Sequence, residues 1–294
     1  MKPGPRLACA VLIQRIDILA PPRDTVDWLT EIIEARGWAA RAASAREKAE
    51  QWADAFLNYL RLELGELNRL GRYAPFAFNS SAEYKIQGAA FVEPTESLQM
   101  QEQKRRRARF GEYVSALRAI NPRQFECLCA GLLSVFKVEN LSVTPYSADQ
   151  GVDFYCKLPL EQHIFGGDLY PTWKRQLAIW MVGQAKHYID GTVSTPEIHK
   201  LVGSVKLLSG PTANRSRFPT LIVRSCDPVF LLFFTTGRLS SESWKLLDES
   251  GVVGMDGEML AAFLADREIG CSALGFEPSL FHSWISEFED RNSR

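Results

Sequence analysis

Apolar residues recur every three to four positions through much of residues 1–110, which predicts a mainly helical N-terminal region. Asp24 is placed to cap one helix, and Gly37 would end it. A longer helix is predicted over residues 43–70, and the irregular stretch 74–97 indicates a hairpin or a long loop. We therefore expect a helical N-terminal domain that serves recognition, sensing or a partner contact.

From about residue 111 the pattern changes to short apolar strands that alternate with amphipathic helices. The expected strands cover residues 141–145, 151–156, 177–186, 229–236 and 252–255. Asn121 would cap the first helix, and Ser194 and Glu197 form a capping-box pattern at the start of another. This alternation predicts an α/β domain over residues 111–270, a mixed or parallel sheet flanked by helices, followed by a C-terminal helical tail at 271–294.

The composition is that of a soluble globular protein, since 46% of the 294 residues are hydrophobic and 23% are charged. The net charge of −1 excludes a chain that is polybasic throughout, so any surface for nucleic acid must be local. Six cysteines without CxxC spacing and only four histidines argue against a structural zinc site and favour free thiols. No apolar run reaches the roughly 18 residues that a membrane span needs. We expect a cytoplasmic protein without membrane contact.

Polar residues stand near the ends of two predicted strands. Gln184 and Lys186 follow an apolar run and, being two residues apart on a strand, point to the same face. Asp153 lies 31 residues before Gln184, which leaves room for a hairpin that brings the two strands side by side. A carboxylate, an amide oxygen and an ammonium at one place suit metal-dependent hydrolysis of a phosphodiester, because Mg²⁺ prefers oxygen ligands and bridges to phosphate.

Four segments carry a resemblance to a known family. They are "FECLCAGLL", "SADQGVDFYC", "VGQAKHY" and "FFTTGRLSSESWKLLDESGVVGMDGEMLAAFL". In this order, over residues 125–264, they resemble the Mrr family of restriction endonucleases, a branch of the PD-(D/E)xK nuclease superfamily. The last segment is the most specific, because the family has a strand ending in a Thr/Ser-Gly turn, a helix, and a hydrophobic pair followed by Asp-Gly. The resemblance implies a restriction-endonuclease-like core.

The resemblance also implies a role for each motif residue. Asp153 would ligate a metal, Gln184 would be the second ligand in a branch that often has QxK in place of ExK, and Lys186 would be the catalytic lysine. Glu126 matches a helix glutamate near the active site of many relatives, and a first-turn acid favoured by the helix dipole is the alternative. The scissile phosphate and the backbone carbonyl of Ala185 would complete the metal shell.

Mg²⁺ is the expected metal, with Mn²⁺ as a substitute. Because Gln184 is neutral, binding without DNA should be weak, and we expect a metal requirement in about the millimolar range. The chain departs from the family by a loop or flap inserted around residues 160–173 and by an expanded stretch at 209–228. Asp149 stands at a frequent acidic position of the family or in a plain turn, and His163 in the inserted loop is a candidate substrate contact.

A run of basic residues precedes the α/β region. Its members are Lys104, Arg105, Arg106, Arg107 and Arg109. Such runs are usually solvated helix faces, but beside a nuclease they would also neutralise phosphates and supply much of the affinity for DNA. The sequence leaves both interpretations open.

The expected function is therefore a Mg²⁺-dependent endonuclease that acts on double-stranded DNA in bacterial restriction or antiphage defence, a setting that comes from the resemblance alone. A homo-oligomer, dimer or higher, is expected because cutting two strands pairs two active sites, and partner proteins of a defence system are expected as well. Two alternatives stay open. One is a repair or junction-processing nuclease on the same core, and the other is a DNA-binding module in which Gln184 marks a degenerate active site.

Overall fold

The computed structural model describes residues 2–145, 151–160, 178–189, 191–208, 220–224 and 226–290. The chain divides into two compact units, residues 1–111 and residues 112–294. The insertions expected around residues 160–173 and 209–228 lie largely outside the described residues.

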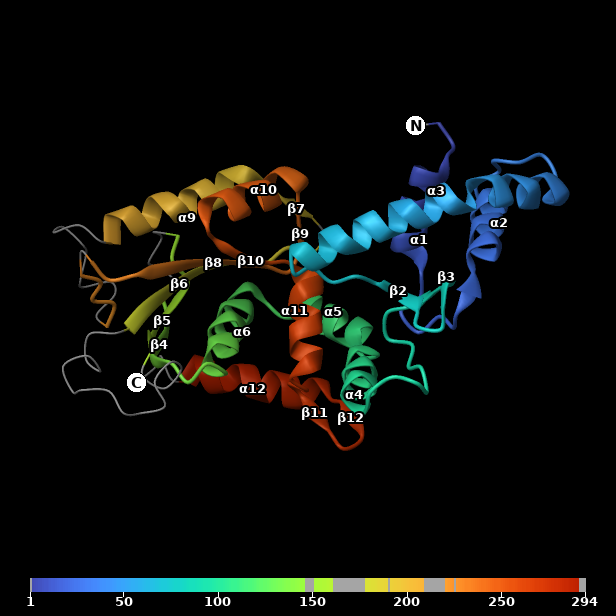
Figure 1. Ribbon diagram of the computed structural model, residues 1–294. Coiled ribbons are helices and arrows are strands. Elements are labelled where there is room, and N and C mark those ends of the chain that lie inside the picture. The colour runs from blue at the N-terminus through green and yellow to red at the C-terminus, as the bar shows by residue number, and fades with distance from the viewer. Residues whose placement is uncertain are drawn as a thin grey trace. The chain divides into compact units, whose positions relative to one another are not determined.

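The N-terminal unit combines four helices with a small antiparallel sheet of strand order β1-β3-β2 (Figure 1). Its elements are α1 (Pro5–Arg15), β1 (Arg23–Asp24), α2 (Thr25–Ala35), α3 (Ala42–Arg69), β2 (Phe76–Asn79), β3 (Ala82–Gly88) and α4 (Leu98–Arg107). Asp24 caps α2 as predicted, because its Oδ1 accepts a hydrogen bond of 2.9 Å from the Val26 N–H. The β2–β3 hairpin resolves the choice between hairpin and loop that the sequence left open.

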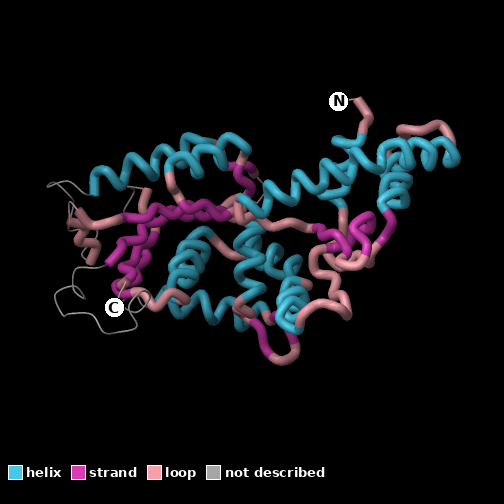
Figure 2. Tube along the Cα trace, viewed as in Figure 1, coloured by secondary structure: helices cyan, strands magenta, loops and turns pink. Residues whose placement is uncertain are grey.

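The C-terminal unit is built on a mixed sheet of five strands in the order β10-β8-β6-β5-β4 (Figure 2). These strands are β4 (Glu139–Val143), β5 (Phe154–Pro159), β6 (Ala178–Lys186), β8 (Val229–Thr235) and β10 (Val253–Met255). β4, β5 and β6 pair antiparallel, whereas β6, β8 and β10 pair parallel. The predicted α/β fold with a mixed central sheet is confirmed.

Helices cover both faces of this sheet, with α9 and α10 on one face and α6 on the other (Figure 1). The helices and short strands of the unit are α5 (Phe110–Ala119), α6 (Pro122–Ser134), β7 (Thr192–Val193), α9 (Thr195–Leu208), β9 (Arg238–Leu239), α10 (Ser241–Ser250), α11 (Gly257–Asp266), β11 (Cys271–Ser272), β12 (Gly275–Phe276) and α12 (Pro278–Asp290). Ile198 and Leu201 of α9 are fully buried in one apolar cluster with Val182 of β6. This packing fixes α9 against the strand that carries Gln184 and Lys186.

A close approach of side chain to backbone occurs on the α6 side of the sheet. Gly183 pairs with Phe154 across β5 and β6, and a Cβ at Gly183 would overlap the Phe154 ring. That ring also stacks on Phe234 of β8, with ring centroids 5.6 Å apart. Glycine at position 183 therefore leaves room for the stacked rings of Phe154 and Phe234, which pack across β5, β6 and β8 next to Gln184.

The expected C-terminal helix is present as α12, and the residues around it pack within the C-terminal unit. β11 and β12 form a short antiparallel hairpin ahead of α12. A Cβ at Gly131 of α6 would overlap the rings of Trp284 and Phe288 of α12, so the absence of a side chain there allows the two helices to pack closely. None of the helices in the described ranges has the length and the apolar character of a membrane-spanning segment.

Candidate active site

Backbone and side-chain hydrogen bonds hold Asp153 beside the end of β6. The Asp153 N–H donates to the Gly183 carbonyl at 2.9 Å, and the Asp153 carbonyl accepts from the Thr144 N–H at 2.8 Å. The Asp153 Oδ2 accepts a hydrogen bond of 2.7 Å from the Ala185 N–H. The carboxylate is thus oriented by the same strand that carries the predicted amide and lysine.

Gln184 has an unusual environment for a buried amide. Its exposed fraction is 4%, and within the described residues its Oε1 has no hydrogen-bond partner. Leaving a buried polar atom unsatisfied costs about 1–3 kcal/mol, so such atoms often indicate a ligand, ion or water. An oxygen in this position fits the donor chemistry of a hard divalent cation.

Lys186 is held at its backbone by the end of the neighbouring strand. Its carbonyl accepts hydrogen bonds from the Thr235 hydroxyl at 2.8 Å and from the Thr236 N–H at 3.2 Å. The Thr236 hydroxyl in turn bonds to both the N–H and the carbonyl of Tyr188, at 2.8 and 2.9 Å. The two threonines of the "FFTTGR" segment therefore fix the backbone at the carbonyl of Lys186 and at Tyr188, two residues after the lysine.

Glu126 on α6 belongs to the same electrostatic environment. Burial raises the pKa of Glu126, a hydrogen bond from Arg123 opposes this, the charge of Asp153 raises the pKa further, and that of Lys186 lowers it. The Arg123 Nη1 lies 2.7 Å from the Glu126 Oε2 and donates to the Thr144 carbonyl at 2.7 Å. Arg123 was not among the site residues predicted from the sequence, although its spacing of three residues from Glu126 on a helix indicated the pair.

The raised pKa of Glu126 predicts a pH dependence of stability in the metal-free protein. Between the ordinary pKa of a glutamate and the raised one, the folded state binds the proton more tightly than the unfolded state. The stability that this proton adds is complete at low pH and is lost as the pH rises through the raised pKa. A glutamine cannot titrate, so Glu126→Gln should gain in melting temperature relative to wild type as the pH rises from about 4 to 8. Melting curves in EDTA test this, and a difference that stays constant or falls with pH would contradict it.

Glu197 on the first turn of α9 is a contact that the sequence interpretation missed. Its Oε2 lies 3.2 Å from the Lys186 Nζ, and its Oε1 lies 2.9 Å from the Lys200 Nζ. The hydrogen bond from Lys200 is the main cause that lowers the pKa of Glu197, partial burial opposes it, and the hydrogen bond from Lys186 lowers it further. The capping-box pattern explained Glu197 by local geometry alone, whereas its carboxylate contacts the predicted catalytic lysine.

His187 follows Lys186 in the chain, but its ring packs elsewhere. His187 Nε2 lies 3.2 Å from the Leu117 carbonyl and its ring meets the edge of Phe125, which agrees with a packing role. Asp149 and His163 lie outside the described residues. Within the described ranges, no group of three or more His, Cys, Asp and Glu side chains is placed to hold a metal ion.

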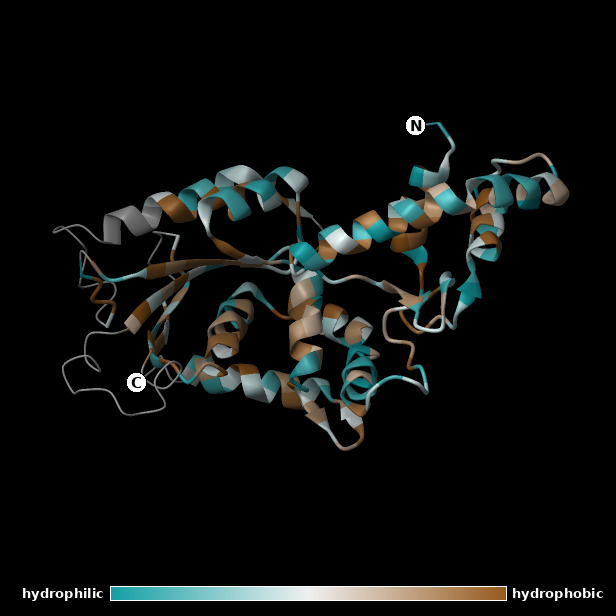
Figure 3. Cartoon of the chain, viewed as in Figure 1, coloured by the Kyte–Doolittle hydropathy of each residue, from teal (hydrophilic) through white to brown (hydrophobic). Residues whose placement is uncertain are grey.

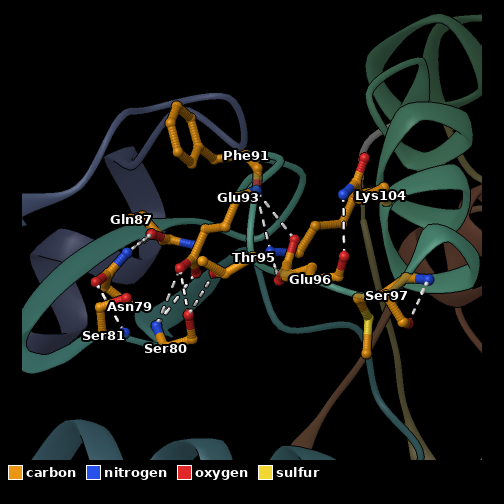
Figure 4. Close-up of polar contacts among 12 residues, drawn as sticks. Asn79, Ser80, Ser81, Gln87, Phe91, Glu93, Thr95, Glu96, Ser97 and Lys104 are labelled. Atoms are coloured by element: carbon orange, nitrogen blue, oxygen red, sulfur yellow. Dashed lines mark hydrogen bonds and ion pairs between the residues drawn. The ribbon is translucent and has the colours of Figure 1, made fainter.

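The DNA contact predicted for Lys104 is corrected by the structure, because this side chain is buried and already has partners. Its exposed fraction is 8%, its Nζ lies 2.5 Å from the Glu96 Oε1, and it donates to the Phe91 carbonyl at 2.8 Å (Figure 4). Glu96 Oε2 also accepts from the N–H of Glu93, whose own carboxylate accepts hydrogen bonds from Ser80 and from the Gln87 amide. Lys104 therefore anchors α4 to the segment that precedes it, and it leaves the set of proposed DNA contacts.

The remaining basic residues of this run lie on or just after α4, a mostly hydrophilic helix (Figure 3). Arg105 has a side chain that is 57% exposed and lies 3.4 Å from Glu102. Arg106 lies 3.6 Å from the same carboxylate group. Arg107 and Arg109 are partly buried and also have interactions of their own. A DNA contact by these four arginines stays a prediction.

The C-terminal unit thus combines a mixed sheet flanked by helices with a carboxylate, a buried amide and a lysine near adjoining strand ends. Residues 117–214 match the family model Mrr_cat, whose description is restriction endonuclease. The predicted resemblance to the Mrr family is confirmed over this third of the chain, and it supports a nuclease. The match ends before residues 233–264, the segment that was the most specific part of the resemblance.

Two solved structures are also similar to the chain. One is the MspJI restriction endonuclease in complex with a 27-mer oligonucleotide, at 16% identity and a TM-score of 0.40, covering 68% of this chain and 40% of that one. The other is the DNA modification-dependent restriction endonuclease AspBHI, at 15% identity and a TM-score of 0.38, covering 70% of this chain and 46% of that one. The chain thus spans less than half of the length of either protein. No curated protein sequence matches it.

Proposed function

We propose that the chain is a metal-dependent endonuclease that hydrolyses phosphodiester bonds of double-stranded DNA. The observation that carries this proposal is the buried oxygen of Gln184, which has no partner among the described residues and shares a strand end with Asp153 and Lys186. The similarity of residues 117–214 to restriction endonucleases supports the same chemistry. A purely structural site would give no reason to bury an amide oxygen without a hydrogen-bond partner.

Asp153 and Gln184, with the carbonyl of Ala185, would hold a divalent ion, Mg²⁺ or Mn²⁺. When bound, this ion supplies Lewis-acid activation of the phosphate and of the attacking water. The Ala185 N–H orients the Asp153 carboxylate, and the sheet holds Gln184 in a dry environment. Because one of the two side-chain ligands is neutral, the metal should bind weakly until a phosphate oxygen of the DNA adds to its ligands. The concentration of metal needed for cutting should therefore be in about the millimolar range.

Lys186 and Glu126 act on the substrate side of the proposed reaction. The Lys186 ammonium donates hydrogen bonds to a non-bridging phosphate oxygen and offsets the negative charge that grows there. Glu126, whose pKa is raised mainly by burial, is suited to orient a water molecule or to accept its proton. Arg123 holds the Glu126 carboxylate in place at 2.7 Å.

Restriction of foreign DNA or another antiphage task is the proposed setting, with a homo-oligomer of two or more chains cutting both strands. The N-terminal unit is proposed to recognise DNA, to sense a signal or to bind a partner protein of the defence system. Arg105, Arg106, Arg107 and Arg109 are its proposed phosphate contacts.

Metal removal tests the proposed activity directly. The full chain should cut plasmid and modified phage DNA in about 1–10 mM Mg²⁺ or Mn²⁺, and cutting should stop in EDTA and return when the metal is restored. Gel electrophoresis of linear and branched substrates gives the result. Binding without cutting in every metal would indicate a module with a degenerate site, and cutting of branched DNA alone would indicate a junction nuclease.

A further inference from the structure

The ion pair between Lys186 and Glu197 joins two elements whose relative position is fixed by packing. Ile198, the residue after Glu197, is fully buried in the same apolar cluster as Val182, which lies four residues before Lys186 on β6. The backbone of Lys186 is held by Thr235 and Thr236 at the end of β8. Helix and strand therefore present the carboxylate and the ammonium to each other from rigid supports.

The carboxylate of Glu197 is itself oriented on both sides. One oxygen lies 2.9 Å from the Lys200 Nζ, three residues further along α9, and the other lies 3.2 Å from the Lys186 Nζ. The Lys200 side chain is 65% exposed, whereas those of Lys186 and Glu197 are 30% and 21% exposed. The half-buried pair is therefore screened less by solvent than the outer contact to Lys200.

A lysine needs such a partner more than most catalytic groups do. Its ammonium sits on a flexible four-carbon chain, so fixing the backbone of Lys186 does not fix its Nζ. A shift of about 1 Å in a reacting group can lower a rate by about 100-fold. A carboxylate in contact with the ammonium limits the positions that the Nζ takes up.

We propose that Glu197 is a positioning residue that holds the Lys186 ammonium in place for the scissile phosphate. This inference rests on the proposed nuclease function. Lys200 has a supporting role, because it orients the carboxylate that in turn orients Lys186. The placement of Glu197 in the first turn of α9 is then set by the active site as well as by the helix terminus.

Kinetics of Glu197→Gln test the proposal. The variant keeps the shape of the side chain but removes its charge, so kcat should fall by about 10–100-fold while KM changes by less than about 3-fold. Glu197→Asp keeps the charge on a shorter side chain and should recover part of the loss. Melting temperatures should stay within about 3 °C of wild type, because the pair is partly exposed.

Glu242→Gln is the matched control, because Glu242 occupies the first turn of α10 as Glu197 does in α9. It should cut DNA at the wild-type rate. An equal loss in Glu242→Gln would show that a helix-terminus charge explains the effect, and this would overturn the proposal. Unchanged or faster cutting by Glu197→Gln, or a loss confined to KM, would overturn it too while leaving the nuclease function intact.

A measurement without DNA tests the contact between Glu197 and Lys186 separately from the proposed nuclease function. Lysine labelling with an amine-reactive reagent, followed by mass spectrometry of the peptide that contains Lys186, reports whether the ammonium is held by Glu197. The rate should rise several-fold in Glu197→Gln, with Lys157 as an internal reference. An unchanged rate would overturn the proposed contact. If wild type cuts no DNA in any metal, the proposed function fails and the positioning role fails with it, whatever the labelling shows.

Discussion

Replacing Asp153 by asparagine or Lys186 by alanine is expected to lower the rate of DNA cleavage by about 1,000-fold or more. Asparagine keeps an oxygen that can accept the hydrogen bond from the Ala185 N–H, so Asp153→Asn removes the charge without disturbing the strand end. Lys186→Ala removes the ammonium but keeps the backbone bonds to Thr235 and Thr236. Both variants should fold and bind DNA, because the proposed chemistry is lost and the supporting sheet is not.

Single-turnover cleavage of a labelled duplex measures this loss, and a gel shift in EDTA measures binding. Lys157→Ala is a suitable control, since Lys157 lies on β5, four residues after Asp153 and opposite Trp180, and has no role in the proposed site. The control should cut at the wild-type rate. Wild-type cutting by both Asp153→Asn and Lys186→Ala would show that the site has been assigned to the wrong residues.

A glutamate in place of Gln184 is expected to lower the half-saturating concentration of Mg²⁺ by about 10-fold or more. The affinity of an oxygen-ligand site for a divalent cation rises with the number of charged ligands, and the wild-type pair has one carboxylate and one amide. The same change should destabilise the protein in EDTA, because the new carboxylate would be buried at a position that is 4% exposed. Added metal should then restore the melting temperature.

Metal titrations of cleavage and of melting temperature give both readouts from one variant. Gln184→Met has a similar volume but offers no oxygen, so it should need more metal than wild type. If Gln184→Glu stays inactive at every metal concentration and gains no thermal stability from metal, the oxygen at position 184 is not a metal ligand. The unpaired amide would then need a different explanation.

Local patterns in the sequence predicted local structure well. The Asp24 cap depends on residues two positions apart, and the cap at Asn121 depends on residues three apart, where Asn121 accepts from the Gln124 N–H at 2.9 Å. The longest predicted helix, over residues 43–70, appears as α3 within one residue of its expected ends. Such bonds form within one turn of chain, so the spacing of residue types is enough to indicate them.

Contacts between elements were not predictable in the same way. A basic run suggested a DNA contact for Lys104, but the packing of α4 buries its ammonium against Glu96. Glu197 matched a capping pattern, but the register of β6 and the placement of α9 bring it to Lys186. In both cases the deciding partner is set by tertiary packing, which a pattern along the chain does not contain.

The arrangement of the site residues was predictable in part from the sequence. That Gln184 and Lys186 lie along one strand follows from a two-residue spacing. That Asp153 lies beside them depends on the antiparallel pairing of Phe154 with Gly183, which the long separation in sequence allowed but did not require. The absence of a hydrogen-bond partner for Gln184 within the described residues could be seen only in three dimensions.

Locating the metal tests the central claim most directly. Crystals of Lys186→Ala with uncleaved DNA and Mn²⁺ should show an anomalous scattering peak about 2.0–2.5 Å from an Asp153 carboxylate oxygen and from the Gln184 Oε1. A phosphate oxygen of the DNA should lie in the same coordination shell. A peak at other residues, or no peak in a metal concentration at which wild type cuts, would contradict the account.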